Sequence, residues 1–159
     1  MNRVGFGFDL HPLIAGRPLV LGGVTVPSEA GLDGHSDADV LSHAVAEALL
    51  GALALGDLGR HFPDTDPRWR GISSLRLLGQ VMELMRGREA TLVNVDATVL
   101  AQAPRLASHL PEMAKRLADV LGLPVERVSV KAKSPEGLGL VGRREGIAAM
   151  AVVSLEVRE

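Results

Sequence analysis

Residues 39–53, with the sequence DVLSHAVAEALLGAL, carry apolar side chains three and four residues apart, the spacing of one face of an α-helix. We expect a helix that begins near Ala38 or Asp39 and ends near Gly56. Its broad apolar face contains Val40, Leu41, Ala44, Val45, Ala48, Leu49 and Leu53. The same helix carries His43 beside that face, four residues after Asp39.

Segments with the two-residue period of a β-strand lie on both sides of this helix. Before it, a half-buried strand is predicted from the alternation of Val4, Phe6 and Phe8 with Gly5, Gly7 and Asp9. Two short apolar runs, 19–21 and 24–26, flank Gly22-Gly23 and indicate a hairpin or a tight bend. After the helix, strands are predicted at 91–101, 128–132 and 147–157. Residues 91–101 alternate cleanly, with Val93, Val95, Ala97 and Val99 on one face.

Two further helices are predicted, one from Ser73 or Ser74 to about Arg86 and one from about His109 to Leu121. Residues 57–71 indicate an ordered loop. The order of elements predicts an α/β (α+β) sandwich in which helices pack on one face of a single sheet. A glycine-rich connection over 133–146 joins the last two strands, so we expect a mixed sheet. The length of 159 residues predicts a single domain over 1–159.

Composition excludes several classes of protein. A net charge of -2 provides no basic field for nucleic acid or an anionic membrane, so we expect neither as a partner. The absence of cysteine excludes disulfides, thiolate zinc ligands and a cysteine nucleophile. No apolar run approaches the ~20 residues of a membrane span, and the N-terminus lacks the pattern of a signal peptide. A cytoplasmic location is the expectation.

Asp9-Leu10-His11 is a candidate for half of a metal site, because residues two apart on a strand point to the same face. We expect Asp9 and His11 to lie on a different face from Val4, Phe6 and Phe8 only if a bulge or the end of the strand intervenes. Pro12 would mark that end. His43 is the third candidate ligand, although a histidine beside an apolar face is commonly a packed core residue. The set of two histidines and one carboxylate suits zinc with an open fourth position, or another divalent ion.

Four polar segments are candidates for contacts with an anionic substrate. Residues 34–39 precede the helix N-terminus, where they either bind an anion with help from His35 or cap the helix through Ser36 or Asp37. Residues 56–67 either form turns or accept hydrogen bonds from hydroxyl groups, and the local pattern favours turns. Residues 101–106 and 131–136 follow strands. Arg105 in the first either pairs with phosphate or stays solvated, and the second is either a polar loop or a phosphate and Mg²⁺ site.

Together these segments resemble one family, the 2-C-methyl-D-erythritol 2,4-cyclodiphosphate synthases of the non-mevalonate isoprenoid pathway. The resemblance runs over essentially the whole chain. It is carried by Gly5-Phe6-Gly7-Phe8-Asp9-Leu10-His11, His35-Ser36-Asp37-Ala38-Asp39-Val40 with His43, Ala54-Leu55-Gly56-Asp57-Leu58-Gly59, Phe62-Pro63-Asp64-Thr65-Asp66, Asn94-Val95-Asp96, Ala101-Gln102-Ala103-Pro104, and Gly142-Arg143 with Glu145-Gly146-Ile147.

The resemblance implies that the substrate is 4-diphosphocytidyl-2-C-methyl-D-erythritol 2-phosphate, which is cyclised with release of CMP. It also implies zinc on Asp9, His11 and His43, a second ion, Mg²⁺ or Mn²⁺, on Glu136, and transition-state stabilisation by His35 and Ser134. The implied substrate contacts are Asp9, Leu10, His11, His35, Ser36, Asp57, Leu58, Gly59, Phe62, Pro63, Asp64, Thr65, Asp66, Ala101, Gln102, Ala103, Pro104, Arg105, Leu106, Ala132, Lys133, Ser134, Pro135, Glu136, Leu140 and Arg143.

The same resemblance implies a homotrimer with active sites between subunits and sheets facing the threefold axis. Lys133-Ser134-Pro135 stands where the family usually has consecutive threonines, and Ser134 keeps a hydroxyl. Leu140 stands where the family usually has phenylalanine, in a region with Arg143 that in some members borders a central cavity for isoprenoid diphosphates. Two rival functions share these residues, a zinc phosphohydrolase and a trimeric nucleotide- or isoprenoid-binding protein.

Overall fold

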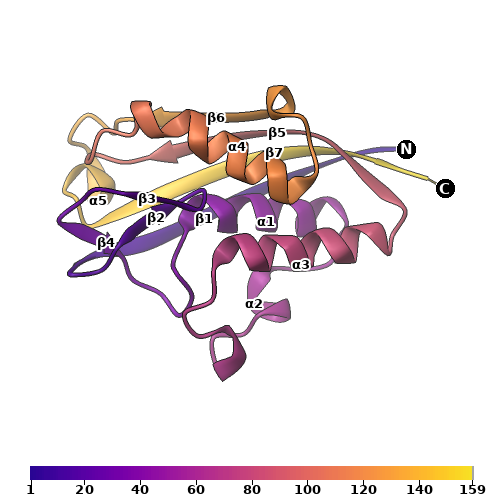
Figure 1. Cartoon of the computed structure of the whole chain (residues 1–159), viewed down its shortest axis with the longest axis horizontal. Helices are drawn as coiled ribbons and strands as arrows, with labels where there is room; N and C mark the ends of the chain where they lie inside the picture. Colours follow the sequence, from indigo (N-terminus) through magenta and orange to yellow (C-terminus); the bar gives the residue numbers. More distant parts are fainter. Residues whose placement is uncertain (159) are drawn as a thin grey trace.

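The computed structural model describes residues 1–158. A five-stranded sheet is covered by helices on one side, and a separate two-stranded sheet consists of β2 (Leu19–Leu21) and β3 (Val24–Val26) (Figure 1). Three long helices, α1 (Val40–Ala52), α3 (Ser74–Arg86) and α4 (Leu110–Leu121), pack on the sheet and on one another. None of the helices in residues 1–158 is long and apolar enough to cross a bilayer. The remaining elements are β1 (Asn2–Ala15), β4 (Ala30–Leu32), α2 (Leu58–His61), β5 (Ala90–Leu100), β6 (Val128–Lys133), α5 (Gly139–Gly142) and β7 (Gly146–Val157), with short 3-10 turns at Pro67–Trp69, Ala107–His109 and Val125–Arg127.

The sheet is mixed, as predicted. Within residues 1–158 its strand order is β4-β1-β7-β5-β6, and β5 with β6 is the parallel pair. Strand β7 lies between β1 and β5 and is antiparallel to both. Strands β2 and β3 form the predicted hairpin around Gly22-Gly23. The beginning of β1 and the end of β7 lie at the same end of the sheet (Figure 1).

Strand β1 approaches helix α1 so closely that only glycine fits at two of its positions. A Cβ atom on Gly5 would lie 1.8 Å from the carbonyl oxygen of Ala48, and one on Gly7 would lie 1.9 Å from that of Ala44. The odd-numbered residues of β1 therefore face the helices. Their even-numbered neighbours face the other side of the sheet, where Val4, Phe6 and Phe8 are 69%, 63% and 52% exposed.

This alternation corrects the prediction that a bulge or strand end must separate Asp9 and His11 from the face of Phe8. The strand continues through Pro12 to Ala15, and the register with β7 is unbroken from Asn2 to Pro12. Proline has no N–H to donate, but Leu13 resumes the pairing by donating to the carbonyl oxygen of Glu145 across 2.9 Å. Asp9 and His11 lie on the helix side simply because they are odd-numbered.

Helix α1 begins where predicted and ends earlier than predicted. Asp39 is its N-cap, so the expectation that Ser36 or Asp37 caps the helix is wrong. The helix ends at Ala52, because Ala54 adopts a left-handed backbone conformation with φ of 56° and Leu55 N–H donates to the carbonyl of Leu50 across 3.0 Å. That arrangement terminates a helix, so Gly56 lies beyond the stop.

Strand β5 does not alternate as cleanly as its sequence suggested. Leu92 pairs with Leu155 and Asn94 pairs with Ser154, which leaves Val93 as the extra residue of a β-bulge. The bulge shifts the alternation by one residue, so Leu92 is buried on the same side as Val95, while Val93 is only half-buried. The prediction that Val93 shares a face with Val95, Ala97 and Val99 was therefore wrong.

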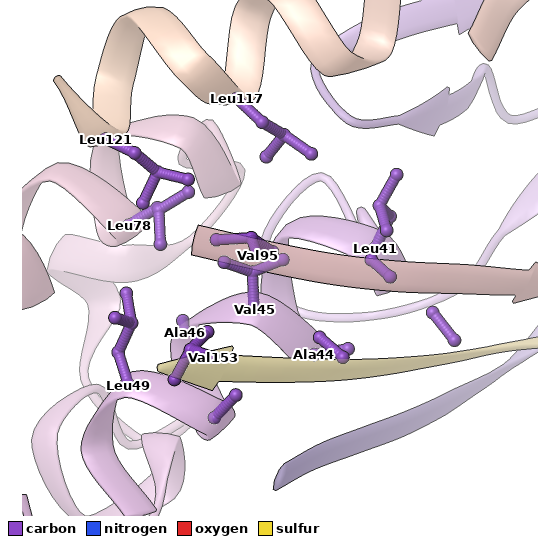
Figure 2. Close-up of a cluster of buried hydrophobic side chains, with 14 of the residues drawn as sticks. Leu41, Ala44, Val45, Ala46, Leu49, Leu78, Val95, Leu117, Leu121 and Val153 are labelled. Carbon is purple, nitrogen blue, oxygen red and sulfur yellow. The ribbon is translucent and has the colours of Figure 1, made fainter. Parts of the chain in front are cut away.

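The main core lies between the three long helices and the sheet (Figure 2). Side chains from α1, α3 and α4 meet β5 and β7 there, represented by Leu41, Val45, Leu49, Leu78, Val95, Leu117, Leu121 and Val153. Removing such a buried leucine costs about 2–5 kcal/mol in proteins, so this layer holds α1 firmly against β1. The candidate metal ligands lie at that junction.

Candidate functional site

Three potential ligand atoms lie close together where β1 packs against the first turn of α1. Asp9 Oδ2 lies 2.8 Å from His11 Nε2 and 2.9 Å from His43 Nδ1, and the two nitrogens are 3.3 Å apart. Asp9 and His11 share the helix side of β1, and the glycines before them allow α1 to bring His43 within reach. The structure thus brings together the three residues predicted as ligands.

The donor set fits a divalent metal ion, and these three residues can hold one. His11 Nδ1 lies 2.8 Å from the carbonyl oxygen of Asp33, which only accepts hydrogen bonds, so in the neutral ring, the form that binds a metal, Nδ1 carries the proton and Nε2 has a lone pair. His43 likewise turns Nε2 away from the cluster, toward the hydroxyls of Ser74 and Ser36 at 2.7 and 3.2 Å. One oxygen and two nitrogens without sulfur match catalytic zinc sites that keep an open position.

The charges of this cluster stabilise one another. Burial alone would raise the pKa of Asp9, but hydrogen bonds donated by the doubly protonated rings of His11 and His43 outweigh it and hold that pKa well below its usual range. Burial would lower the pKa of His11, and the hydrogen bond and charge of Asp9 outweigh it, so the pKa is raised above 6.5. Asp9 is therefore a carboxylate at neutral pH, as a metal ligand must be.

The cluster opens into a cavity that also contains predicted substrate-binding residues. Besides the ligands, its lining comprises Gly34, His35, Ser36, Glu47, Leu58, Phe62, Asp64, Trp69 and Leu77. Helix α2 and the 3-10 turn at Pro67–Trp69 build one wall, and Phe62 packs edge-on against Trp69 with ring centroids 5.2 Å apart. Residues 57–71, predicted as an ordered loop, thus contain two short helical turns capped by Asp57 and Asp66.

The segment that carries His35 and Ser36 is held from two sides. Arg17 donates to the carbonyl oxygens of Gly34 and Ser36 across 3.0 and 3.1 Å. On the other side, Gly71 N–H donates to the carbonyl of His35 across 2.8 Å. At the start of α1, the buried Asp39 carboxylate accepts from the N–H groups of Gly22, Gly23 and Ser42. The buried Asp39 carboxylate thus already occupies the N-terminal end of this helix.

Several predicted residues lie away from this cavity within the described chain. Leu10 is even-numbered, so its side chain faces the sheet surface shared with Phe8. Segment 101–106 follows β5, and segment 132–136 begins with the last two residues of the parallel strand β6. The two segments lie close together, since Gly137, directly after the second, donates from its N–H to Gln102 Oε1 across 2.8 Å. Leu140 and Arg143 belong to α5 and its C-cap. Asp57, Gly59, Pro63, Thr65 and Asp66 flank the lining residues.

Sequence reasoning missed several residues at this site. Glu47 lines the cavity one helical turn after His43, so its i+4 spacing on α1 could have revealed it. Arg17, Trp69 and Ser74 come from turns and a helix start far away in sequence. Their sequence neighbourhoods show no pattern that links them to the metal ligands.

Comparison with known proteins agrees with this geometry. The chain is 57% identical over 155 residues to the 2-C-methyl-D-erythritol 2,4-cyclodiphosphate synthase of Desulfitobacterium hafniense, covering 98% of each chain. A solved structure of 2C-methyl-D-erythritol-2,4-cyclodiphosphate synthase in a CDP-bound form is 40% identical with a TM-score of 0.89, covering 97% of this chain and 100% of that one. The bifunctional IspDF of Campylobacter jejuni matches with a TM-score of 0.95 at 40% identity, where this chain spans 43% of its length. Residues 2–156 match the YgbB family, and the chain belongs to that family.

Proposed function

We propose that the chain cyclises 4-diphosphocytidyl-2-C-methyl-D-erythritol 2-phosphate to 2-C-methyl-D-erythritol 2,4-cyclodiphosphate. An oxygen of the 2-phosphate attacks the β-phosphorus of the diphosphate, a new P–O–P bond closes the ring, and the bond from the β-phosphorus to the CMP oxygen breaks. The observation that carries the proposal is that Asp9, His11 and His43 share one cavity with His35, Ser36 and the loop at Phe62 and Asp64.

The residues of this chain act by positioning and by charge, as expected of an intramolecular phosphoryl transfer. His35 and Ser36, fixed by Arg17, lie beside the ligand cluster where they can donate hydrogen bonds to phosphate oxygens. The segment from Asp57 to Asp66 provides acceptors for the hydroxyl groups of the erythritol. Phe62 and Trp69 close that side of the cavity and limit the access of water.

The metal assignments are part of the proposal. Zinc on Asp9, His11 and His43 would supply positive charge to a phosphate oxygen of the substrate. A second ion, Mg²⁺ or Mn²⁺, would be held by Glu136 with the diphosphate. Glu136 lies in the segment that follows β6, next to Ser134, whose hydroxyl accepts from Glu136 N–H across 3.1 Å. Ser134 is the proposed partner of His35 in stabilising the transition state.

A homotrimer with active sites between subunits explains why the proposed site residues fall into two groups. In the described chain the metal cavity is lined from β1, residues 34–36, α1 and residues 58–77, while the segments 101–106 and 132–136 lie elsewhere. We propose that these segments, from a second copy, bind the cytidine. The exposed row of Val4, Phe6 and Phe8 is the surface proposed to face the threefold axis. A central cavity near Leu140 and Arg143 for an isoprenoid diphosphate, a single domain over 1–159 and a cytoplasmic location stay predictions.

The decisive experiment is a product assay with a defined metal content. Purified protein is stripped with a chelator, reloaded with zinc plus Mg²⁺, and incubated with the diphosphocytidyl substrate. We expect CMP and the cyclic diphosphate in equal amounts, and loss of both after stripping. CMP with a linear diphosphate would instead indicate the phosphohydrolase.

A variant distinguishes the binding protein from the enzyme. Replacement His43→Ala removes one ligand and should abolish CMP release while the far-UV circular dichroism stays unchanged. Undiminished CMP release by metal-stripped His43→Ala protein would contradict the proposed function.

A further inference from the structure

Behind the candidate metal ligands, a chain of buried side chains joins α1 to the first turn of α3. His43 Nε2 lies 2.7 Å from Ser74 Oγ, and Ser74 is 1% exposed. Ser74 Oγ in turn donates to Asp37 Oδ1, and the backbone N–H of Ser74 donates to Asp37 Oδ2 across 3.0 Å. Three residues from three different segments are thus connected, with the carboxylate at the far end from the cluster.

Proton counting fixes the directions of the two hydrogen bonds that join Asp37, Ser74 and His43. An ionised carboxylate only accepts, so the single hydroxyl proton of Ser74 points to Asp37. The Ser74 oxygen then faces His43 Nε2 with a lone pair, and Nε2 must carry the proton of that contact. A neutral imidazole has one N–H, so Nδ1, which faces Asp9 and His11, is left with a free lone pair.

We infer that Ser74 is a positioning residue that, held by Asp37, keeps His43 in the tautomer and orientation required for metal binding. His11 has the same arrangement in simpler form, with Nδ1–H directed to the carbonyl of Asp33. Outer contacts of this kind orient metal-binding histidines generally, and their loss typically weakens metal affinity about 10- to 100-fold.

Ser36 is the other hydroxyl near His43, and the geometry makes it the weaker partner. Its Oγ lies 3.2 Å from Nε2, against 2.7 Å for Ser74, and it also accepts from Ala38 N–H across 3.2 Å. Asp37 is anchored independently, since it accepts from Asp39 N–H across 3.1 Å. The acceptor for the Ser74 proton is therefore held by a contact that does not involve α3.

The test measures zinc affinity of metal-free protein by competition with a chromophoric chelator, without substrate. Ser74→Ala should bind zinc about 10- to 100-fold more weakly than the wild type. Ser73→Ala is the matched control, because the neighbouring Ser73 side chain makes no capping hydrogen bond within the described residues and should leave affinity unchanged. Asp37→Ala frees the Ser74 proton to donate to His43 Nε2, so it should also weaken zinc binding although it does not touch His43.

Nitrogen-15 spectra of the imidazoles in metal-free wild type report the tautomer directly and need no variant to fold. At about pH 9, well above the ordinary imidazole pKa, we expect the proton of His43 on Nε2. A proton on Nδ1, or zinc binding by Ser74→Ala as tight as by Ser73→Ala, would overturn the inference. The inference rests on the proposed function only through the metal centre. If the inference holds but CMP release fails, the proposed reaction alone is wrong.

Discussion

The backbone N–H of Leu58 donates to Oε1 of Glu47 across 3.0 Å, which ties the start of α2 to the middle of α1. Glu47 lies one turn after His43 on the same helix and lines the same cavity. The metal ligands and the proposed hydroxyl-binding segment after Asp57 therefore share one rigid support. Burial raises the pKa of the Glu47 carboxyl, so an uncharged acceptor is an appropriate substitute for it.

Two substitutions of Glu47 distinguish the contribution of its hydrogen bond from the contribution of its charge. Glu47→Ala leaves Leu58 N–H without its acceptor, and we expect kcat/KM to fall about tenfold, mainly through a higher KM. Glu47→Gln keeps an amide oxygen and should stay within about threefold of the wild type. The chain's single tryptophan, Trp69, lines the cavity, so its fluorescence can report ligand binding in each variant. If Gln were as harmful as Ala, the carboxylate charge would be the important property.

Arg17 should matter for catalysis although it lies outside the cavity lining. Its planar guanidinium reaches two carbonyl oxygens, of Gly34 and Ser36, and Lys cannot span both. We expect Arg17→Lys to lower kcat about tenfold with little change in secondary structure. Arg70→Ala, which alters another arginine beside the same loop, is the control and should remain close to wild type. Because Arg17→Lys keeps its positive charge, equal losses in both variants would contradict the role assigned to the two carbonyl contacts of Arg17.

Gly7→Ala should be strongly destabilising. Its Cβ would lie 1.9 Å from the backbone oxygen of Ala44, and neither backbone can yield without separating β1 from α1. We expect a loss of about 3 kcal/mol or more, which for a chain of this size lowers Tm by roughly 6–12 °C. Gly51→Ala in α1 is the contrasting variant, since its Cβ would have 3.7 Å to the carbonyl oxygen of Phe6. Differential scanning calorimetry should find Gly51→Ala neutral or stabilised by about 0.5–1 kcal/mol.

Phe6→Glu tests the proposed trimer. Phe6 is 63% exposed on the sheet face away from the helices, between Val4 and Phe8. A charge buried at an interface between copies is costly, so multi-angle light scattering should show a shift from trimer to monomer. Glu83→Gln on α3 is an exposed charge change far from that face and should leave the mass unchanged. A trimeric Phe6→Glu protein would show that the copies meet elsewhere.

The metal-free protein should be most stable at mildly acidic pH. The folded-state pKa of His11 is raised above 6.5, so its stabilisation is complete below that pH and is lost as pH rises through the raised pKa. The pKa of Asp9 is lowered from 3.8, so its stabilisation is present above that pH and is lost as pH falls further. Thermal unfolding in chelator should therefore show Tm declining above about pH 6.5. The His11→Gln protein should not show that decline in Tm. An unchanged slope of Tm against pH would assign the decline to another titrating group.

The features that could be predicted from the sequence are those that depend on local periodicity. The metal trio followed from the two-residue period at Asp9 and His11 and from helix spacing at His43, and the long elements followed from their patterns. Short elements such as β4 and α2 span only three or four residues, too few for a period to be visible. The bulge at Val93 depends on how β5 pairs with β7, which no local pattern contains.

Contacts between distant segments account for the remaining differences. Ser74 reaches Asp37 across 37 residues of sequence, and only the packing of α3 on α1 brings them together. Likewise, Gly5 and Gly7 were visible as glycines, but their role in admitting α1 became clear only from the positions of Ala44 and Ala48. Both cases concern tertiary contacts. The residues that neighbour one partner in the sequence do not indicate which residue the other partner is.

The position of β7 in the sheet has a consequence for biosynthesis. This strand follows every other described element in the chain, yet it lies between β1 and β5 and pairs with both. A nascent chain that has emerged only as far as α5 therefore has two halves of a sheet and no strand to join them. Folding must wait until the last dozen described residues have left the ribosome, and until then β1 and β5 expose unpaired edges.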